Sequence, residues 1–425
     1  MEFLGIAALV LLLVAGAPIF IAVFVAVAII VVFALGIDPI VVWSVMFDKV
    51  NSLVLIAVPM FILSGQLLHV GGAARPLVNL LNTFMGHIPG GPAYAVVVAC
   101  VLFAAMSSST MAAVAGVAPV MTPILMQCGY SKRFSIGLIL ASSSMAGIIP
   151  PSIGLILYGF ITETSVLALW TAAIIPGLVQ ATLIMLTVWI HSRRGHFTSL
   201  PKASWGDRWR ALKEGWPVLI MPVIVLGPLY GGIATPSEVG SIAAVYSLFL
   251  GVVVYKGLKL RELWQASYKT VSILAAVFAI IIGALLLSTA LVYVRIPYRL
   301  TESLANMGLN WAGFMAVMLV AYLVMGAFLD SSSILLISVP ILLPTIVSLN
   351  INPVMYGIFT ENCVEIAIIT PPYGLLLFAS AGILRENFSF VARSVLLFYP
   401  ALIIHPILIA YIPQMSLWLP NLLGY

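Results

Sequence analysis

Two short runs of polar side chains interrupt strongly apolar stretches of this sequence. One is SSST at residues 107–110, and the other is DSSS at residues 330–333. Polar groups in hydrocarbon need partners, and a carboxylate at the bilayer centre costs about 3 kcal/mol on insertion scales. Hydroxyl, carboxylate and freed backbone oxygens can replace the hydration shell of a small hard cation such as Na⁺. The two runs therefore predict a cation site at membrane depth.

Each run also has a purely structural explanation. Small residues let transmembrane helices approach closely, which accounts for serine clusters without any ligand. Asp330 would in the same way serve to bind the N–H groups exposed at the start of a helix. Both explanations stay open for the sequence alone.

Prolines repeat around the two runs at a fixed distance. Two prolines four residues apart follow each run, and an adjacent proline pair comes later in each half of the chain. The matching residues, all 221 positions apart, are Pro119 with Pro340, Pro123 with Pro344, Pro150 with Pro371, and Pro151 with Pro372. This spacing indicates an internal duplication in which each copy carries a polar tip and a proline break.

The composition places these segments in a membrane. The 425 residues are 63% hydrophobic and 7% charged, with a mean hydropathy of +1.20, so charged groups are too few to cover a surface in water. The first apolar stretch is too long for a signal-peptide core, and we expect it to be a retained span. The three cysteines and five histidines are dispersed, so we expect no disulfide framework and no transition-metal site.

Basic residues gather in two loops, at 193–213 and 256–269. Beside apolar spans this charge favours a cytoplasmic location by the positive-inside rule, and not nucleic-acid binding. Counting crossings from these loops puts the N-terminus in the cytoplasm and the C-terminus in the periplasm.

The sequence thus predicts an all-α polytopic membrane protein built as an inverted repeat. Two re-entrant helical hairpins are expected at 92–127 and 310–349, and two broken helices at 133–163 and 353–384. Further spans are expected near residues 3–33, 51–70, 165–192, 217–233, 236–255, 271–293 and 389–413.

Breaks at membrane depth free backbone groups that must face protein or a wet cavity. The tips and breaks are therefore the expected ligand sites, with positive helix ends suited to an anion. For sodium we predict Ser107, Ser108, Ser109, Gly147, Pro150, Asp330, Ser331, Ser332, Thr370 and Pro371. For the substrate we predict Ser109, Thr110, Ser152, Ser333, Thr370 and Tyr373.

Three glutamates have other expected roles. Glu365 precedes the second break and would hold the broken helix or sense charge, whereas Glu361 is expected nearer the membrane interface. Glu238, in TPSE, is typical of a helix start with Thr235 or Ser237 as the cap.

Four segments carry a resemblance to a known family. They are IIPPSIG at 148–154, ATPSEVGSIAAVYSL at 234–248, LDSSSILLISVPILLP at 329–344 and NCVEIAIITPPYG at 362–374. With them the whole chain resembles the large membrane subunit of the tripartite ATP-independent periplasmic (TRAP) transporters. Where the first tip of that family usually has a glycine between serines, this chain has Ser108.

The resemblance implies a multi-pass importer of organic acids in a bacterial inner membrane, driven by a sodium gradient. It implies two partners, a small membrane subunit of a few helices and a periplasmic substrate-binding protein. It also implies an elevator mechanism, in which a transport domain slides against an elevator-type scaffold. The expected parts are scaffold helices of the first repeat at 1–91, transport-domain halves at 92–163 and 309–384, scaffold and connecting helices at 164–308, and a C-terminal scaffold helix at 385–425. The family's sodium sites fall on residues 107–110, 147–151, 330–333 and 370–372. Sialic acid, a C4-dicarboxylate or a sugar acid would each fit as the substrate.

Other functions stay open. A passive channel would show no ion coupling, and the sequence lacks the charge rings of many pores. An intramembrane enzyme would need a serine–histidine or paired-aspartate arrangement, which the spacing does not offer. A subunit driven by an ATPase would need a docking surface in one of the basic loops.

Overall fold

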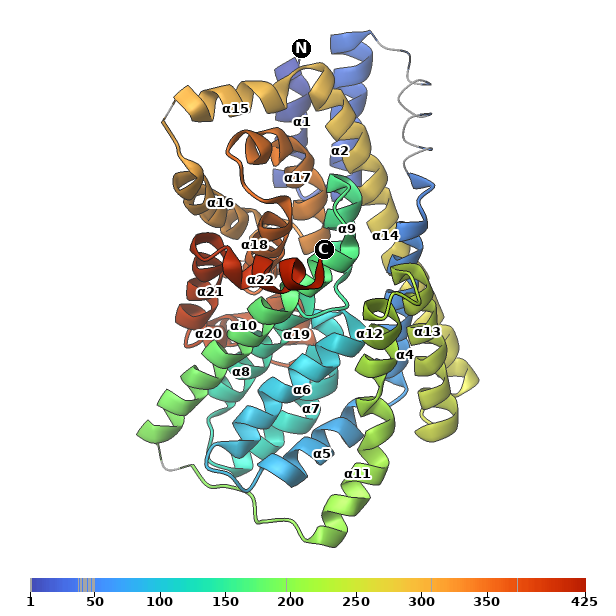
Figure 1. Ribbon diagram of the computed structural model, residues 1–425, viewed down its shortest axis with the longest axis vertical. Helices are drawn as coiled ribbons and strands as arrows, with labels where there is room; N and C mark the ends of the chain where they lie inside the picture. Colours follow the sequence, from blue (N-terminus) through green and yellow to red (C-terminus); the bar gives the residue numbers. More distant parts are fainter. Residues whose placement is uncertain are drawn as a thin grey trace.

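The chain folds into a helical bundle, seen here in a computed structural model. The structure describes residues 2–36, 38, 40, 44, 47, 50–195, 197–306, 308–372 and 374–425, and in these ranges it contains no strand. Figure 1 shows an elongated molecule in which α6 and α7 lie in the lower half, α16 and α17 lie in the upper half, and α19 lies near the middle.

The N-terminal half contains helices as far as the first basic loop. They are α1 Glu2–Val14, α2 Ile19–Ala28, α4 Ala57–Val70, α5 Ala74–Met85, α6 Gly91–Ser107, α7 Thr110–Gln127, α8 Lys132–Ser143, α9 Ile153–Thr162 and α10 Val166–Arg194.

The rest of the chain continues in the same way. Its helices are α11 Trp205–Leu219, α12 Met221–Tyr230, α13 Pro236–Phe249, α14 Leu260–Tyr293, α15 Ile296–Asn306, α16 Trp311–Met325, α17 Ser331–Ser348, α18 Pro353–Ala367, α19 Leu375–Leu384, α20 Phe388–Val395, α21 Tyr399–Tyr411 and α22 Gln414–Leu423.

Several of these helices suit a bilayer. By length and composition, the described part of the chain has seven helices able to cross a membrane, or up to nine if each of two bent pairs is one span. The chain is therefore an all-helical, multi-pass membrane protein, as predicted.

The polar runs lie where helices stop and restart. At the first tip, Ser108 adopts a left-handed conformation (φ 49°, ψ 18°), and the Ser109 side chain caps α7 by accepting from the backbone N–H of Ala112. At the second tip, Asp330 caps α17 by accepting from the backbone N–H of Ser333. Both caps satisfy donors that the break would otherwise leave exposed.

The two predicted broken helices are also interrupted where the prolines stand. Helix α8 continues as a short 3-10 helix at Ser144–Gly147 and is then interrupted. The next helix, α9, begins at Ile153 and is capped by Ser152. Helix α18 ends at Ala367, and α19 begins at Leu375. The Pro150–Pro151 and Pro371–Pro372 bonds are both cis.

The predicted extents of three elements were wrong, namely those of the first span, the first basic loop and the C-terminal helix. The stretch 3–33 is not one helix, because Gly16 takes a positive φ and Pro18 follows, so α1 and α2 pack against each other as a hairpin. The predicted loop at 193–213 includes the start of α11, which Ser204 caps through the Asp207 N–H.

The predicted single helix at the C-terminus is three helices, α20, α21 and α22. Helices α19 and α20 bend by 117°, and α21 and α22 bend by 56°. Glycine and proline do not mark the first bend. The chain turns there at Arg385, which adopts a left-handed conformation.

Helix α10 holds both broken helices from one side. Gln180 donates to the Ser144 hydroxyl and accepts from the Asn362 side-chain amide, each at 3.2 Å. The Trp170 indole donates to the Ser152 carbonyl at 3.1 Å. All of these residues are buried, so the bonds fix the backbone beside each break.

Candidate functional site

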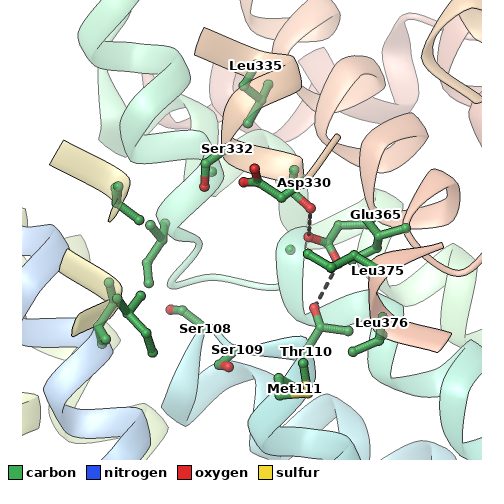
Figure 2. Close-up of a pocket in the computed structure, with 18 of the residues that line it drawn as sticks. Ser108, Ser109, Thr110, Met111, Asp330, Ser332, Leu335, Glu365, Leu375 and Leu376 are labelled. Atoms are coloured by element: carbon green, nitrogen blue, oxygen red, sulfur yellow. Dashed lines mark hydrogen bonds between the residues drawn. The ribbon is translucent and has the colours of Figure 1, made fainter. Parts of the chain in front are cut away.

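A cavity of about 250 Å³ lies between the two polar tips. Figure 2 shows Ser108, Ser109 and Thr110 on one side of it, with Asp330 and Ser332 across from them. Residues of α4 and α14 complete the wall, among them Ile62, Gln66, Ile273 and Val277. The fold thus brings together two tips that are more than 200 residues apart in sequence.

Glu365 joins both tips to the second broken helix. Its carboxylate accepts from the Thr110 hydroxyl at 2.7 Å and from the Ser331 hydroxyl at 3.3 Å, and Figure 2 shows Thr110 pointing at it. The side chain is only 6% exposed, so these bonds are poorly screened by water. The predicted holding role of Glu365 is therefore supported by direct contacts to each hairpin.

Asp330 accepts hydrogen bonds from within its own tip. One carboxylate oxygen accepts from the Ser333 backbone N–H at 3.3 Å, and the other accepts from the Ser333 hydroxyl. This is the structural role considered for Asp330. Asp330 also lines the cavity, so its carboxylate is part of the cavity wall.

The serines of the first tip have different hydrogen-bond partners. Ser108 donates to the Pro151 carbonyl, which ties the tip to the first proline break. Ser107 donates to the Phe103 carbonyl at 2.9 Å within α6 and is fully buried. Each hydroxyl that donates keeps lone pairs as possible ligands.

Two glycines of the first broken helix lie directly against two carboxylates. A Cβ at Gly147 would lie well inside 3.0 Å of Glu365, and one at Gly154 would lie equally close to both carboxylate oxygens of Glu361. Only glycine leaves room for the acids at these positions, so α18 and the break at residues 147–154 fit together through this contact.

The position of Glu361 differs from the prediction. Instead of lying near the membrane interface, its side chain is 1% exposed and lines the cavity. Sequence spacing could not place it there, because its neighbours come from the other half of the chain. Gly154, Gln66 and the apolar residues of α4 and α14 were missed for the same reason.

The predicted ligands divide into two groups. Those that line the cavity are Ser108, Ser109, Thr110, Gly147, Asp330, Ser331 and Ser332. The others lie at the tips or beside the breaks without lining it, namely Ser107, Pro150, Ser152, Ser333, Thr370 and Pro371. Tyr373 lies outside the described residues.

The predicted ligands that do not line the cavity form local hydrogen bonds and helix caps. Ser152 caps α9, Ser333 binds Asp330, and the Thr370 hydroxyl donates to the Ile366 carbonyl at 2.7 Å. Glu238 likewise has the predicted structural role, since it forms a reciprocal capping box with Thr235.

The charge of the cavity wall is one-sided. Three carboxylates line it, from Asp330, Glu361 and Glu365, and the described lining residues include no Lys, Arg or His. Buried carboxylates without compensating charge are costly, so the wall is suited to cationic ligands.

Comparison with known proteins places this architecture in a family. Residues 6–415 match the family described as "Tripartite ATP-independent periplasmic transporter, DctM component". The match covers both tips, both breaks and the cavity between them.

Three named relatives are similar in sequence to this chain over most of their length. The C4-dicarboxylate TRAP transporter large permease protein DctM of Rhodobacter capsulatus is 35% identical, with 89% of each chain covered. The ectoine TRAP transporter large permease protein TeaC of Halomonas elongata is also 35% identical, covering 87% of this chain and 86% of its own. The sialic acid protein SiaM of Vibrio cholerae is 32% identical, with 89% of each chain covered.

A solved structure shares the fold at low identity. The YdaH transporter of Alcanivorax borkumensis superposes with a TM-score of 0.56 and 16% identity, covering 91% of this chain and 90% of that one. At this identity the likeness concerns architecture and not cargo.

Proposed function

Because the chain belongs to the DctM, or large permease, family of TRAP transporters, we propose that it is the large transmembrane subunit of a sodium-coupled importer of a small organic acid. The observation that carries this proposal is the cavity between the two tips, lined by hydroxyl and carboxylate oxygens and by side chains of α4 and α14.

The relatives support a small polar cargo. Their names assign C4-dicarboxylates, ectoine, sialic acid and 2,3-diketo-L-gulonate to proteins of this family. A cavity of about 250 Å³ lies just below the range of about 300–1,000 Å³ that is usual for small-molecule sites, which favours a small cargo.

The oxygen set supports sodium as the coupling ion. Ser108, Ser109 and Thr110 on one side and Asp330 and Ser331 on the other offer hard oxygen ligands around one space. Sodium would enter as a transported ion and offset the negative wall while the substrate is bound.

The arrangement of the two tips supports an elevator mechanism. Hairpins α6–α7 and α16–α17 approach the cavity from opposite halves of the molecule, as expected if they are re-entrant and inverted. In this proposal the tips and broken helices move together across the membrane, past helices such as α4 and α14.

The family also indicates the setting. We propose a multi-pass location in a bacterial inner membrane, with a cytoplasmic N-terminus and a periplasmic C-terminus. A small membrane subunit and a periplasmic substrate-binding protein would be the partners, as the tripartite family description implies.

Uptake into proteoliposomes tests the coupling. The chain is reconstituted with its partner subunits, and uptake is compared with and without an inward sodium gradient. We expect accumulation only with the gradient, and Asp330→Asn should raise the sodium concentration for half-maximal uptake about tenfold, because a charged ligand is lost.

Asp207→Asn is the matched control, since Asp207 is an exposed acid at the start of α11. It should behave like the wild-type protein. Uptake that persists at full extent after the sodium gradient is abolished would refute the proposed coupling.

A further inference from the structure

Glu361 is a buried carboxylate with unused binding capacity. Its Oε2 atom is inaccessible to solvent and has no hydrogen-bond partner in the described part of the chain. The side chain is 1% exposed, yet it lines the cavity. A buried acceptor left without a donor is expensive, so it indicates a missing partner.

The other two acids of the wall are already occupied. Glu365 accepts from two hydroxyl groups, one from each tip, and Asp330 accepts from the backbone and side chain of Ser333. Glu361 therefore differs from its neighbours in having an oxygen that no donor among the described residues satisfies.

The surroundings of Glu361 offer it little compensation. A Cβ at Gly147 or at Gly154 would lie within 3.0 Å of a Glu361 carboxylate oxygen, and neither glycine has a side chain that donates. The second nearby acid, Glu365, shares the contact with Gly147 and adds negative charge. What the site lacks is a positive charge that also donates or coordinates.

We propose that Glu361 binds a cationic group inside the cavity, and that the transported substrate supplies it as an ammonium or amidinium. This inference rests on the proposed transport function and narrows its cargo to a zwitterionic acid, in preference to a dicarboxylate. A dianion would bring two more negative charges to a wall that already holds three carboxylates. A zwitterion places its cation at Glu361 and leaves its carboxylate for the helix start at Thr110.

An alkali ion could supply the same positive charge, so the test separates the two sources. Binding of ectoine, a zwitterion, and succinate, a dianion, is measured by calorimetry on the purified full-length chain at fixed sodium. Melting temperature is measured separately against sodium concentration. Wild type is compared with Glu361→Gln, and with Glu302→Gln as a control on an exposed acid of α15.

We expect the wild-type chain to prefer ectoine, and Glu361→Gln to weaken ectoine binding about tenfold or more while changing succinate binding little. The control should keep the wild-type values. If Glu361→Gln instead raises only the sodium concentration for half-maximal stabilisation, the cationic group is the metal ion, and the inference of a zwitterionic cargo is overturned.

The inference is overturned if the wild-type chain prefers succinate. It is also overturned if Glu361→Gln alters neither ectoine binding nor the sodium response. Should Glu361→Gln not fold, Glu361→Asp serves instead, since it keeps the charge on a shorter side chain and should weaken ectoine binding less than tenfold. A wild-type chain that ignores sodium but loses ectoine through Glu361→Gln refutes the coupling and leaves this inference intact.

Discussion

The contact between Glu365 and Thr110 predicts a measurable coupling between the second broken helix and the first tip. Their side-chain oxygens are 2.7 Å apart, and the two residues are 6% and 8% exposed. A hydrogen bond to a charged group contributes about 1.5–3 kcal/mol to stability, and burial limits its screening.

A double-mutant cycle isolates this term. The variants are Glu365→Leu, which removes both acceptors, and Thr110→Val, which removes the hydroxyl at nearly constant shape. We expect the two changes together to cost less than the sum of each alone, with a coupling free energy of about 1.5–3 kcal/mol. The free energy of unfolding is measured in mixed micelles without sodium, so that ion binding does not enter.

Thr187→Val provides the control cycle with Glu365→Leu. The Thr187 hydroxyl is bound to the Leu183 carbonyl within α10, far along the chain from either tip. Its coupling to Glu365 should be zero within about 0.5 kcal/mol. A coupling that small for Thr110 as well would show that the contact does not hold the tip.

Two further substitutions test the packing of the breaks. Gly147→Ala should destabilise the chain by about 1–3 kcal/mol, because the added methyl would overlap Glu365, whereas Gly227→Ala, which meets open space in α12, should be neutral or stabilising by up to about 1 kcal/mol. Ser108→Ala should cost about 1 kcal/mol by losing its bond to Pro151, and Ser108→Gly should recover much of that because glycine adopts the left-handed conformation at φ 49° without strain. Thermal unfolding of each variant checks both statements, and equal stability for Ser108→Ala and the wild-type chain would contradict the second.

The breaks could be predicted because their causes are local. Proline removes a backbone donor wherever it stands, and serine or aspartate caps a helix through its own next few residues. The starts of α7 at Thr110 and α17 at Ser331 follow from this chemistry. The repeated spacing then predicted which tips belong together.

The position of Glu361 could not be predicted because its cause is not local. Two glycines of another broken helix make room for it, and nothing near residue 361 signals them. The hairpin of α1 and α2 was missed for a different reason. Hydropathy is high on both sides of Gly16, so an average over the stretch conceals the turn.

The hydrogen bonds beside the breaks bear on which helices would move. The His405 imidazole of α21 donates to the Pro176 carbonyl of α10 at 2.8 Å, and Tyr399 donates to the Ile369 carbonyl at the second break at 2.9 Å. The bonds of Gln180 tie α10 to both broken helices, and those of His405 and Tyr399 tie α21 to α10 and to the second break. Breaking several buried polar contacts in each cycle would be costly. In an elevator, α10 and α21 would therefore travel with the tips. The division predicted from the sequence, in which scaffold segments begin at residues 164 and 385, would instead assign both helices to the scaffold.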